Sequence, residues 1–171
     1  MSELKVGMIG LDTSHASAFV KLLNDPANEF HVPGVRIVKA FPGGSAKFSS
    51  SINRVEGFTK ELSEKGIEIV DSIEALAGLD AYFLESVDGD QHLEQFKILA
   101  NFGKPVYIDK PLACNYSDAK AIVDLAKEKN IPLMSCSSLR YALGICDLKK
   151  EEDTSKKNLN PFFTLLMIKL K

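Results

Sequence analysis

Short runs of β-branched and aliphatic residues alternate along this chain with segments whose apolar residues recur at helical spacing. The apolar runs predict six buried strands, at residues 4–10, 35–40, 67–70, 79–84, 105–108 and 131–134. Helices are predicted between them, at about 16–24, 52–65, 90–102 and 119–130, with a short one opening at 71–74. Such alternation is typical of parallel βαβ units. The expected fold class is therefore α/β, a doubly wound parallel sheet in three layers with helices on both faces.

The expected sheet also predicts where a ligand would bind. In a doubly wound sheet, ligands lie beyond the carboxyl ends of the strands, where the strand order reverses. Four loops follow strands in this way, at residues 10–15, 41–47, 85–92 and 109–111. Functional residues are therefore expected in these loops.

The first loop keeps only part of the GxGxxG pattern of dinucleotide-binding proteins. Aligned on Gly10, the places of the second and third glycines are held by Asp12 and His15. A carboxylate about 4 Å from a phosphate costs roughly 4 kcal/mol at an effective dielectric near 20. The interaction of the phosphate with the N-terminus of a helix offsets only about 0.3–1 kcal/mol of this cost. A dinucleotide can therefore bind here if Asp12 points away, is protonated, or is neutralised by His15 or a cation.

The same loop has a second interpretation, because Asp12, Thr13 and Ser14 are all residue types that cap helix N-termini. The two interpretations are compatible, since a capping side chain turns toward backbone amides and away from a ligand. The candidate cofactor-binding residues of this loop are Gly10, Asp12, Thr13, Ser14 and His15.

The loop after the second strand lacks the acidic residue that often binds the adenosine ribose hydroxyls of NAD. Ser45 and Lys47 stand there instead and could hold a 2′-phosphate, which favours NADP. The alternative is a glycine–proline turn with a solvated lysine.

Residues 103–113 read Gly-Lys-Pro-Val-Tyr-Ile-Asp-Lys-Pro-Leu-Ala. This segment resembles the G-K-x-V-x-x-E-K-P-L-A segment of the glucose–fructose oxidoreductase/inositol dehydrogenase (Gfo/Idh/MocA) family. Arg140 is similar to the arginine that follows the sixth strand of that family. The resemblance covers about residues 4–142 and implies a Rossmann-type, NAD(P)-binding domain.

The resemblance implies NAD(P)-dependent hydride transfer on sugars, polyols or related hydroxy compounds. Lys110 matches the family lysine that lies beside the nicotinamide and polarises the reacting hydroxyl or carbonyl. Asp109 replaces the usual glutamate, and Pro111 would fix the turn, with a cis bond as one option. Independently of the family, a lysine beside a carboxylate at the end of a strand can stabilise an oxyanion or move a proton. A surface ion pair is the alternative.

The loop after the fourth strand supplies three further candidates. His92 matches the family histidine that opens the next helix, and its alternative role is a hydrogen bond to the backbone. Ser86 and Val87 occupy the part of the loop whose backbone would face the cofactor.

A rival interpretation makes five side chains in these loops ligands of a divalent cation, which would suit a metal-dependent hydrolase. They are Asp12, His15, Asp88, His92 and Asp109. No HxxH or HExxH spacing supports this interpretation, so we assign no metal ligands.

Charge and cysteine usage narrow the expected partners and compartment. The formal net charge of −2 argues against a nucleic-acid or anionic-membrane partner, and no apolar run approaches the ~20 residues that span a bilayer. Cys114, Cys136 and Cys146 form no CxxC pair, which is typical of small buried thiols in a reducing cytoplasm. The expected partners are a nicotinamide dinucleotide, NAD or NADP, and a small sugar- or polyol-like substrate. A homo-oligomer is left open.

The character of the sequence changes near its end, where a charged run at 149–157 precedes an apolar run at 161–168. We expect residues 1–142 to form the NAD(P)-binding domain. Residues 143–171 are expected to be an atypical tail, the remnant or replacement of a second domain that would bind substrate. The leading hypothesis is the nucleotide-binding half of an NAD(P)-dependent oxidoreductase, slow or inactive alone. The alternative is a non-catalytic nucleotide- or sugar-binding module.

Overall fold

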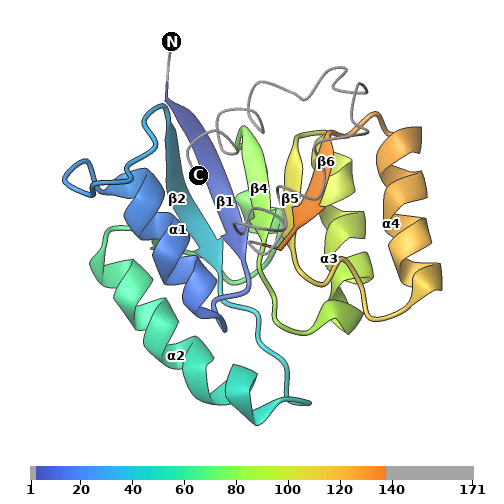
Figure 1. Ribbon diagram of the computed structural model, residues 1–171, viewed down its shortest axis with the longest axis horizontal. Coiled ribbons are helices and arrows are strands. Elements are labelled where there is room, and N and C mark those ends of the chain that lie inside the picture. The colour runs from blue at the N-terminus through green and yellow to red at the C-terminus, as the bar shows by residue number, and fades with distance from the viewer. Residues whose placement is uncertain (1–2, 138–171) are drawn as a thin grey trace, which may run out of the picture.

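The computed structural model describes residues 3–137, which form one six-stranded sheet of order β3-β2-β1-β4-β5-β6 (Figure 1). The strands are β1 (Leu4–Ile9), β2 (Val35–Phe41), β3 (Glu68–Ile69), β4 (Ala81–Leu84), β5 (Val106–Asp109) and β6 (Leu133–Cys136). Every pairing between them is parallel. This order is that of a doubly wound, Rossmann-type sheet, so the predicted fold class is confirmed. Arg140, Cys146 and the predicted 143–171 tail lie outside the described residues.

Four helices connect the strands. They are α1 (Ser14–Asn24), α2 (Ser49–Glu64), α3 (His92–Leu99) and α4 (Tyr116–Glu128), with short 3-10 turns at Glu74–Leu76, Gly89–Gln91 and Ala100–Phe102. The residue before α1 is Thr13, and the residue before α4 is Asn115. Both have extended backbones and accept an amide hydrogen bond, so they end the loops and start the helices.

The helices cover the sheet on both faces, which gives the predicted three layers. On one face, Val20 of α1 and Leu62 of α2 pack with Met8 of β1 in one buried cluster. On the other face, Phe96 of α3 and Ile122 of α4 pack in a second cluster. Because successive side chains of a strand point to opposite faces, the central strands supply apolar residues to both clusters.

Two predicted elements are shorter than expected. The third strand, at one edge of the sheet, pairs with β2 only through Glu68 and Ile69. The segment at 71–74 opens a single 3-10 turn, in which the Ser72 hydroxyl accepts a 3.4 Å bond from the amide of Ala75. Neither change moves a loop of the predicted ligand edge.

The register of the central strands brings the loops at their carboxyl ends together. Ile9 at the end of β1 pairs with Leu84 at the end of β4, and Leu84 pairs with Ile108 of β5. The residues that follow, Gly10 and Glu85, therefore lie beside Asp109 at one edge of the sheet.

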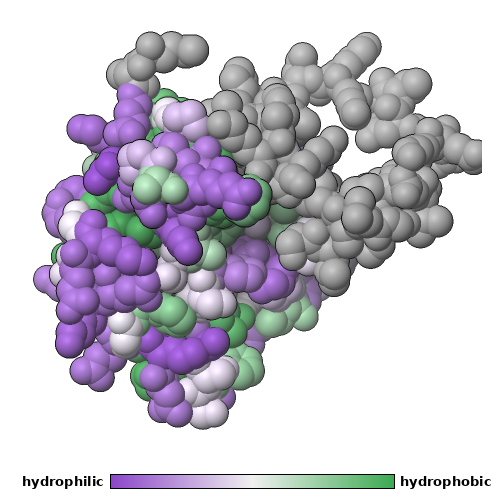
Figure 2. Space-filling view, turned by 60° about the vertical axis from the view of Figure 1, so that its left-hand side comes forward, coloured by the Kyte–Doolittle hydropathy of each residue, from purple (hydrophilic) through white to green (hydrophobic). Residues whose placement is uncertain are grey.

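The described surface is mixed in character. Hydrophilic side chains cover much of the face seen in Figure 2, with apolar patches scattered among them. Within residues 3–137, no helix has both the length and the apolar character needed to cross a membrane. Cys114 and Cys136 are free thiols, and the expectation of buried thiols is wrong for Cys114, which is exposed in the loop between β5 and α4.

Candidate functional site

The turn after β1 requires a glycine, because any side chain at this position would displace the neighbouring backbone. Gly10 has φ +91°, and a Cβ at this position would lie 2.3 Å from the backbone nitrogen of Ser86. The amide of Gly10 donates to Phe41 O at the end of β2 at 3.0 Å, and the next amide, of Leu11, donates to Pro42 O in the loop after β2 at 2.7 Å. The loops after β1, β2 and β4 therefore meet around Gly10.

Asp12 does not face the space beyond this turn. Its side chain is completely buried, and its two oxygens accept hydrogen bonds from Ser51 Oγ at 2.5 Å and from the amide of Val87 at 3.2 Å. The carboxylate therefore joins the first turn of α2 to the loop after β4. Of the arrangements in which a dinucleotide could be tolerated, this is the one in which Asp12 points away.

We expect Asp12→Ala to lower the free energy of unfolding by about 2 kcal/mol, because Ser51 Oγ and the Val87 amide would lose their acceptor. Chemical denaturation followed by circular dichroism measures the change. Asp71 is exposed and makes no hydrogen bond within the described part of the chain, so Asp71→Ala is the matched control, with an expected change below about 0.5 kcal/mol. Equal stability of the two variants would contradict a structural role for Asp12.

The first turn of α1 carries the other residues expected in this loop. Thr13 is the cap, since its hydroxyl accepts a 3.3 Å bond from the amide of His15. Ser14 is exposed at the N-terminus of the helix. His15 turns across the edge of the sheet, and its Nδ1 lies 2.7 Å from Asp109 Oδ2.

Ser45 and Lys47, the candidates for holding a 2′-phosphate, already have acidic partners. The buried Ser45 hydroxyl donates to Asp88 Oδ2 at 2.7 Å, and Lys47 Nζ lies 3.0 Å from Asp90 Oδ2. Asp90 is the main cause of the raised pKa of Lys47, through a hydrogen bond and its charge. A phosphate at this position would meet two carboxylates as well as the lysine.

His92 joins two of the loops through its ring. The side chain is completely buried, with Nε2 2.8 Å from Ser86 O and Nδ1 3.2 Å from Leu112 O. A neutral imidazole can donate to only one of these carbonyls. Val87 presents its amide to Asp12, and the hydroxyl of Ser86 is buried without a hydrogen-bond partner in the described chain.

Lys110 follows β5 and is held by its neighbour. Its Nζ lies 3.2 Å from Asp109 Oδ2, the same oxygen that meets His15, and its side chain is 52% exposed. The Tyr107 hydroxyl donates to the other oxygen, Oδ1, at 3.3 Å. The Lys110–Pro111 peptide bond is cis. Asp109 thus binds a lysine, a histidine and a tyrosine at the end of one strand.

Sequence reasoning missed Glu85, which lies between these groups. The side chain is 1% exposed, and neither carboxylate oxygen has a hydrogen-bond partner in the described chain. Burial raises the pKa of Glu85 well above its usual value, the nearby charge of Asp109 raises it further, and Lys110 lowers it. Burial, followed by the charges of Glu85 and Asp109, also raises the pKa of Tyr107. The signal in the sequence was an acid directly after a fully apolar strand.

The structure does not bring the five side chains of the rival metal interpretation into one cluster. Asp12 and Asp88 are bonded to serine hydroxyls, and His92 to backbone carbonyls. Among the described residues, His15 and Asp109 group with Glu85, whereas Asp88 groups with Asp90 and Cys114.

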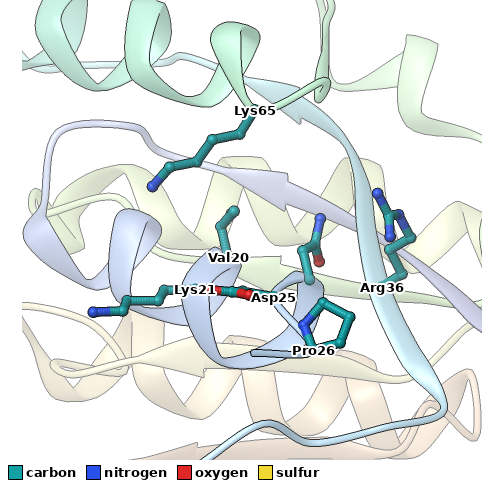
Figure 3. A pocket seen from close by; sticks show the side chains of 7 residues that line it. Val20, Lys21, Asp25, Pro26, Arg36 and Lys65 are labelled. Carbon is teal, nitrogen blue, oxygen red and sulfur yellow. The ribbon is translucent and has the colours of Figure 1, made fainter. Parts of the chain in front are cut away.

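A hollow of about 520 Å³ lies far from these loops, beside the C-terminal end of α1. Lys21, Arg36 and Lys65 are among its lining residues (Figure 3). Arg36 stands near the start of β2, so this hollow is at the amino edge of the sheet. Its position excludes it from the ligand edge predicted for a doubly wound fold.

Known proteins with similar sequences have the same Rossmann-type fold. A family model described as an oxidoreductase family with an NAD-binding Rossmann fold matches residues 4–136. An uncharacterized oxidoreductase of Streptococcus pneumoniae serotype 4 is 26% identical over 98 residues, which are 57% of this chain and 26% of that protein.

Solved structures show the same architecture. The dehydrogenase MviM of Clostridium difficile is 34% identical, with a TM-score of 0.60 over 81% of this chain and 40% of that one. The WlbA dehydrogenase of Bordetella pertussis, solved with NADH and UDP-GlcNAcA, is 17% identical, with a TM-score of 0.66 over 86% of this chain and 41% of that one. This second likeness concerns the fold alone. The chain spans 26% to 41% of the lengths of these relatives.

Proposed function

This chain belongs to the Gfo/Idh/MocA family of oxidoreductases, and we propose that it forms the NAD-binding part of an enzyme that oxidises or reduces a sugar-like hydroxy compound. The observation that carries the proposal is the position of Lys110. It lies at the carboxyl end of β5, held by Asp109, in the same edge of the sheet as the Gly10 turn. A charged lysine at this edge can act on a substrate oxygen beside a bound dinucleotide.

The proposed cofactor surface is made of backbone without side chains. Gly43 and Gly44 have φ +63° and +104°, and a Cβ on Gly43 would lie 3.6 Å from Cα of Gly10. Glycines of two loops therefore lie side by side, and those after β2 compensate in part for the glycines replaced by Asp12 and His15. The N-terminus of α1 at Ser14 adds a partial positive charge for a phosphate. The inward orientation of Asp12 is compatible with a bound dinucleotide, because its carboxylate accepts hydrogen bonds from Ser51 and Val87 and does not face the ligand.

The nicotinamide ring supplies the hydride chemistry when the cofactor is bound. Lys110 would bind the reacting hydroxyl or carbonyl oxygen and stabilise negative charge on it. Asp109 orients the ammonium group through the 3.2 Å contact, and His15 and Tyr107 fix Asp109 in turn. His92 is a positioning residue, because it holds the loop after β4 against the loop that carries Lys110.

The surroundings of Ser45 favour NAD over NADP, in contrast to the preference expected from the sequence. Asp88 already accepts the Ser45 hydroxyl, and Asp90 already neutralises Lys47. A 2′-phosphate would have to displace these contacts and lie near two negative charges. We therefore infer that the cofactor is NAD.

The substrate class rests on the relatives. The WlbA structure is a complex with NADH and UDP-GlcNAcA, which supports a sugar derivative as the substrate of the enzyme of which this chain forms the proposed NAD-binding part. The second candidate function is a nucleotide-binding module without catalysis. The departure from the GxGxxG pattern at Asp12 and His15 favours it, because hydride transfer requires the dinucleotide to be held in one orientation, whereas binding alone does not.

Direct titration tests cofactor binding. We expect NADH and NAD to bind the purified chain, and NADPH and NADP to bind about tenfold more weakly, since roughly 1.4 kcal/mol separates tenfold affinities. NADH and NADPH are followed by fluorescence, and the oxidised forms by calorimetry. Absence of binding by all four dinucleotides would overturn the proposed function in both its catalytic and non-catalytic forms.

The preference for NAD has its own test. We expect Asp90→Asn to strengthen NADPH binding several-fold and to leave NADH binding nearly unchanged, because Lys47 is released from its partner. Glu94→Gln is the matched control, since it removes the same charge from an exposed residue of α3. An equal effect of both variants on NADPH would indicate a general charge effect and would refute the role of Asp90.

A further inference from the structure

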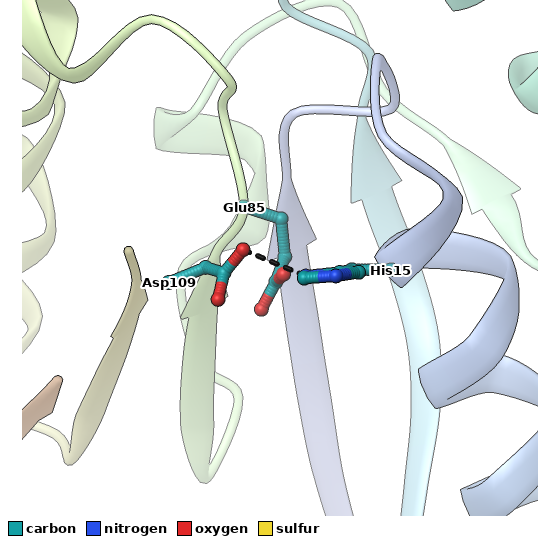
Figure 4. A group of neighbouring side chains, drawn as sticks. All are labelled: His15, Glu85 and Asp109. Atoms are coloured by element: carbon teal, nitrogen blue, oxygen red, sulfur yellow. Dashed lines mark hydrogen bonds and ion pairs between the residues drawn. The ribbon is translucent and has the colours of Figure 1, made fainter. Parts of the chain in front are cut away.

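Three side chains that are able to bind a metal ion meet at the carboxyl edge of the sheet (Figure 4). His15 comes from the first turn of α1, Glu85 follows β4, and Asp109 ends β5. One nitrogen or oxygen atom of each lies within 4.8 Å of the corresponding atoms of the other two. Because β1, β4 and β5 are neighbours in the sheet, the fold itself brings these residues together.

Glu85 distinguishes this cluster from an ordinary group of acids. Both of its carboxylate oxygens are buried, and neither has a hydrogen-bond partner in the described part of the chain. Buried polar groups are almost always paired, so an orphaned carboxyl group calls for a partner. The side chain points toward Asp109 and His15 (Figure 4), which places such a partner among the three residues.

We propose that His15, Glu85 and Asp109 bind a divalent transition-metal ion of the zinc type. One imidazole and two carboxylates suit Zn²⁺, and also Mn²⁺, better than they suit Ca²⁺, which prefers oxygen ligands only. Around a tetrahedral ion with bonds of about 2.1 Å, ligand atoms lie about 3.4 Å apart. The spacing in the cluster brackets this value, from 2.7 Å between His15 and Asp109 to no more than 4.8 Å.

The neighbours of the cluster fit this role. The Tyr107 hydroxyl donates to Oδ1 of Asp109, which leaves Oδ2 to face His15. Such outer contacts orient metal ligands. Lys110 also contacts Oδ2, and its side chain is 52% exposed, so an ion bound at Oδ2 would displace the ammonium group toward solvent. Three protein ligands leave a fourth position for water or for a substrate oxygen, as in catalytic zinc sites.

Protons compete with a metal ion for the ligand atoms of His15, Glu85 and Asp109. A carboxyl oxygen or imidazole nitrogen that carries a proton cannot bind a metal ion at that atom. An ion must displace protons from these groups. Its affinity is therefore expected to rise with pH, and its binding is expected to release protons.

Calorimetric titration of the 171-residue chain, stripped with EDTA and dialysed, tests the proposal with ZnCl₂ and then with MnCl₂. We expect one ion per chain, bound with a dissociation constant in roughly the micromolar range or below, and release of about one proton or more. The heats in two buffers of different ionisation enthalpy give the number of protons. Absence of binding by both ions would overturn the site.

Variants locate the ion. His15→Gln and Glu85→Gln are each expected to weaken binding at least about tenfold. Glu94→Gln is the charge control, and Cys114→Ser tests the other candidate group, Asp88, Asp90 and Cys114. Both should leave the affinity unchanged. Loss of binding in Cys114→Ser, or full binding in Glu85→Gln, would assign the ion elsewhere and refute the proposal.

Two measurements keep these results interpretable. Circular dichroism verifies that each variant folds. Because His15 is half-buried on a helix surface, His15→Gln is expected to fold and can test the metal site even if Glu85→Gln does not fold. NADH fluorescence in the same samples reports dinucleotide binding separately. The two proposals share Asp109, but ion binding and dinucleotide binding are measured separately, so the failure of one can be told from the failure of the other.

Discussion

Replacing Gly10 by alanine is expected to lower the free energy of unfolding by about 2–6 kcal/mol, a large share of the roughly 5–15 kcal/mol typical of a domain. Two effects add. Alanine at φ +91° is strained by about 1–3 kcal/mol. Its Cβ would also lie 2.3 Å from Ser86 N and 2.5 Å from Ser86 Cα, so backbone would have to move, which costs about 1–3 kcal/mol more.

The same substitution should remove dinucleotide binding, because the loops after β1, β2 and β4 meet at Gly10. Urea denaturation followed by circular dichroism measures the stability, and NADH fluorescence below the unfolding transition measures binding. If the free energy of unfolding of Gly10→Ala lies within about 1 kcal/mol of that of the original chain, the backbone of Ser86 does not lie as close to Gly10 as the structure has it.

Gly57 provides a matched control with the opposite sign. It lies within α2, and a Cβ built on it meets nothing within 4 Å. Gly57→Ala should therefore raise the free energy of unfolding by about 0.5–1 kcal/mol, because alanine restricts the unfolded chain and favours helix. Opposite effects of the same chemical change at Gly10 and Gly57 would separate the tight turn from a general response to an added methyl group.

Much of the fold follows from patterns along the chain. Apolar runs and helical spacing predict the strands and the four main helices, since those signals depend on local periodicity. The length of β3 does not follow, because an apolar run has the same composition at the edge of a sheet as in the middle. Exact strand ends depend on pairing partners, which the run itself does not specify.

The site divides in the same way. Lys110 and Asp109 could be located because a motif and a strand end coincide. The direction of the Asp12 side chain could not, because its partner Ser51 is 39 residues further along the chain. Glu85 was missed since its burial is a property of the sheet order. Only the adjacency of β1, β4 and β5 brings it against Asp109 and encloses it.

Glu85→Gln is expected to make the metal-free protein more stable at neutral and alkaline pH. Burial raises the pKa of Glu85 well above its usual value of 4.5, so the folded protein holds this proton more tightly than the unfolded chain does. The stabilising contribution is complete below pH 4.5 and is lost as the pH rises through the folded pKa. The loss is about 1.4 kcal/mol for each pH unit in that window.

Glutamine has nearly the shape of glutamic acid and carries no charge, so the variant should lack this slope. Urea denaturation in EDTA, at intervals from pH 4 to pH 9, measures both curves. They should nearly coincide at pH 4 and separate as the pH rises, with the variant more stable. The exposed Glu94 supplies the control, because Glu94→Gln should give a curve parallel to that of the original chain.

Asp109 and Lys110 act on Glu85 in opposite directions, and their effects set the sign of this test. Asp109 adds to the rise in the pKa of Glu85, and Lys110 opposes it. If Lys110 prevailed, the carboxylate would be stabilised and Glu85→Gln would destabilise the protein at pH 8, which would contradict the prediction. Added Zn²⁺ should raise the stability of the original chain and leave that of Glu85→Gln almost unchanged, because a bound ion pairs the carboxylate that the variant lacks. The pH curves with and without Zn²⁺ therefore distinguish a buried proton from a bound ion at the same side chain.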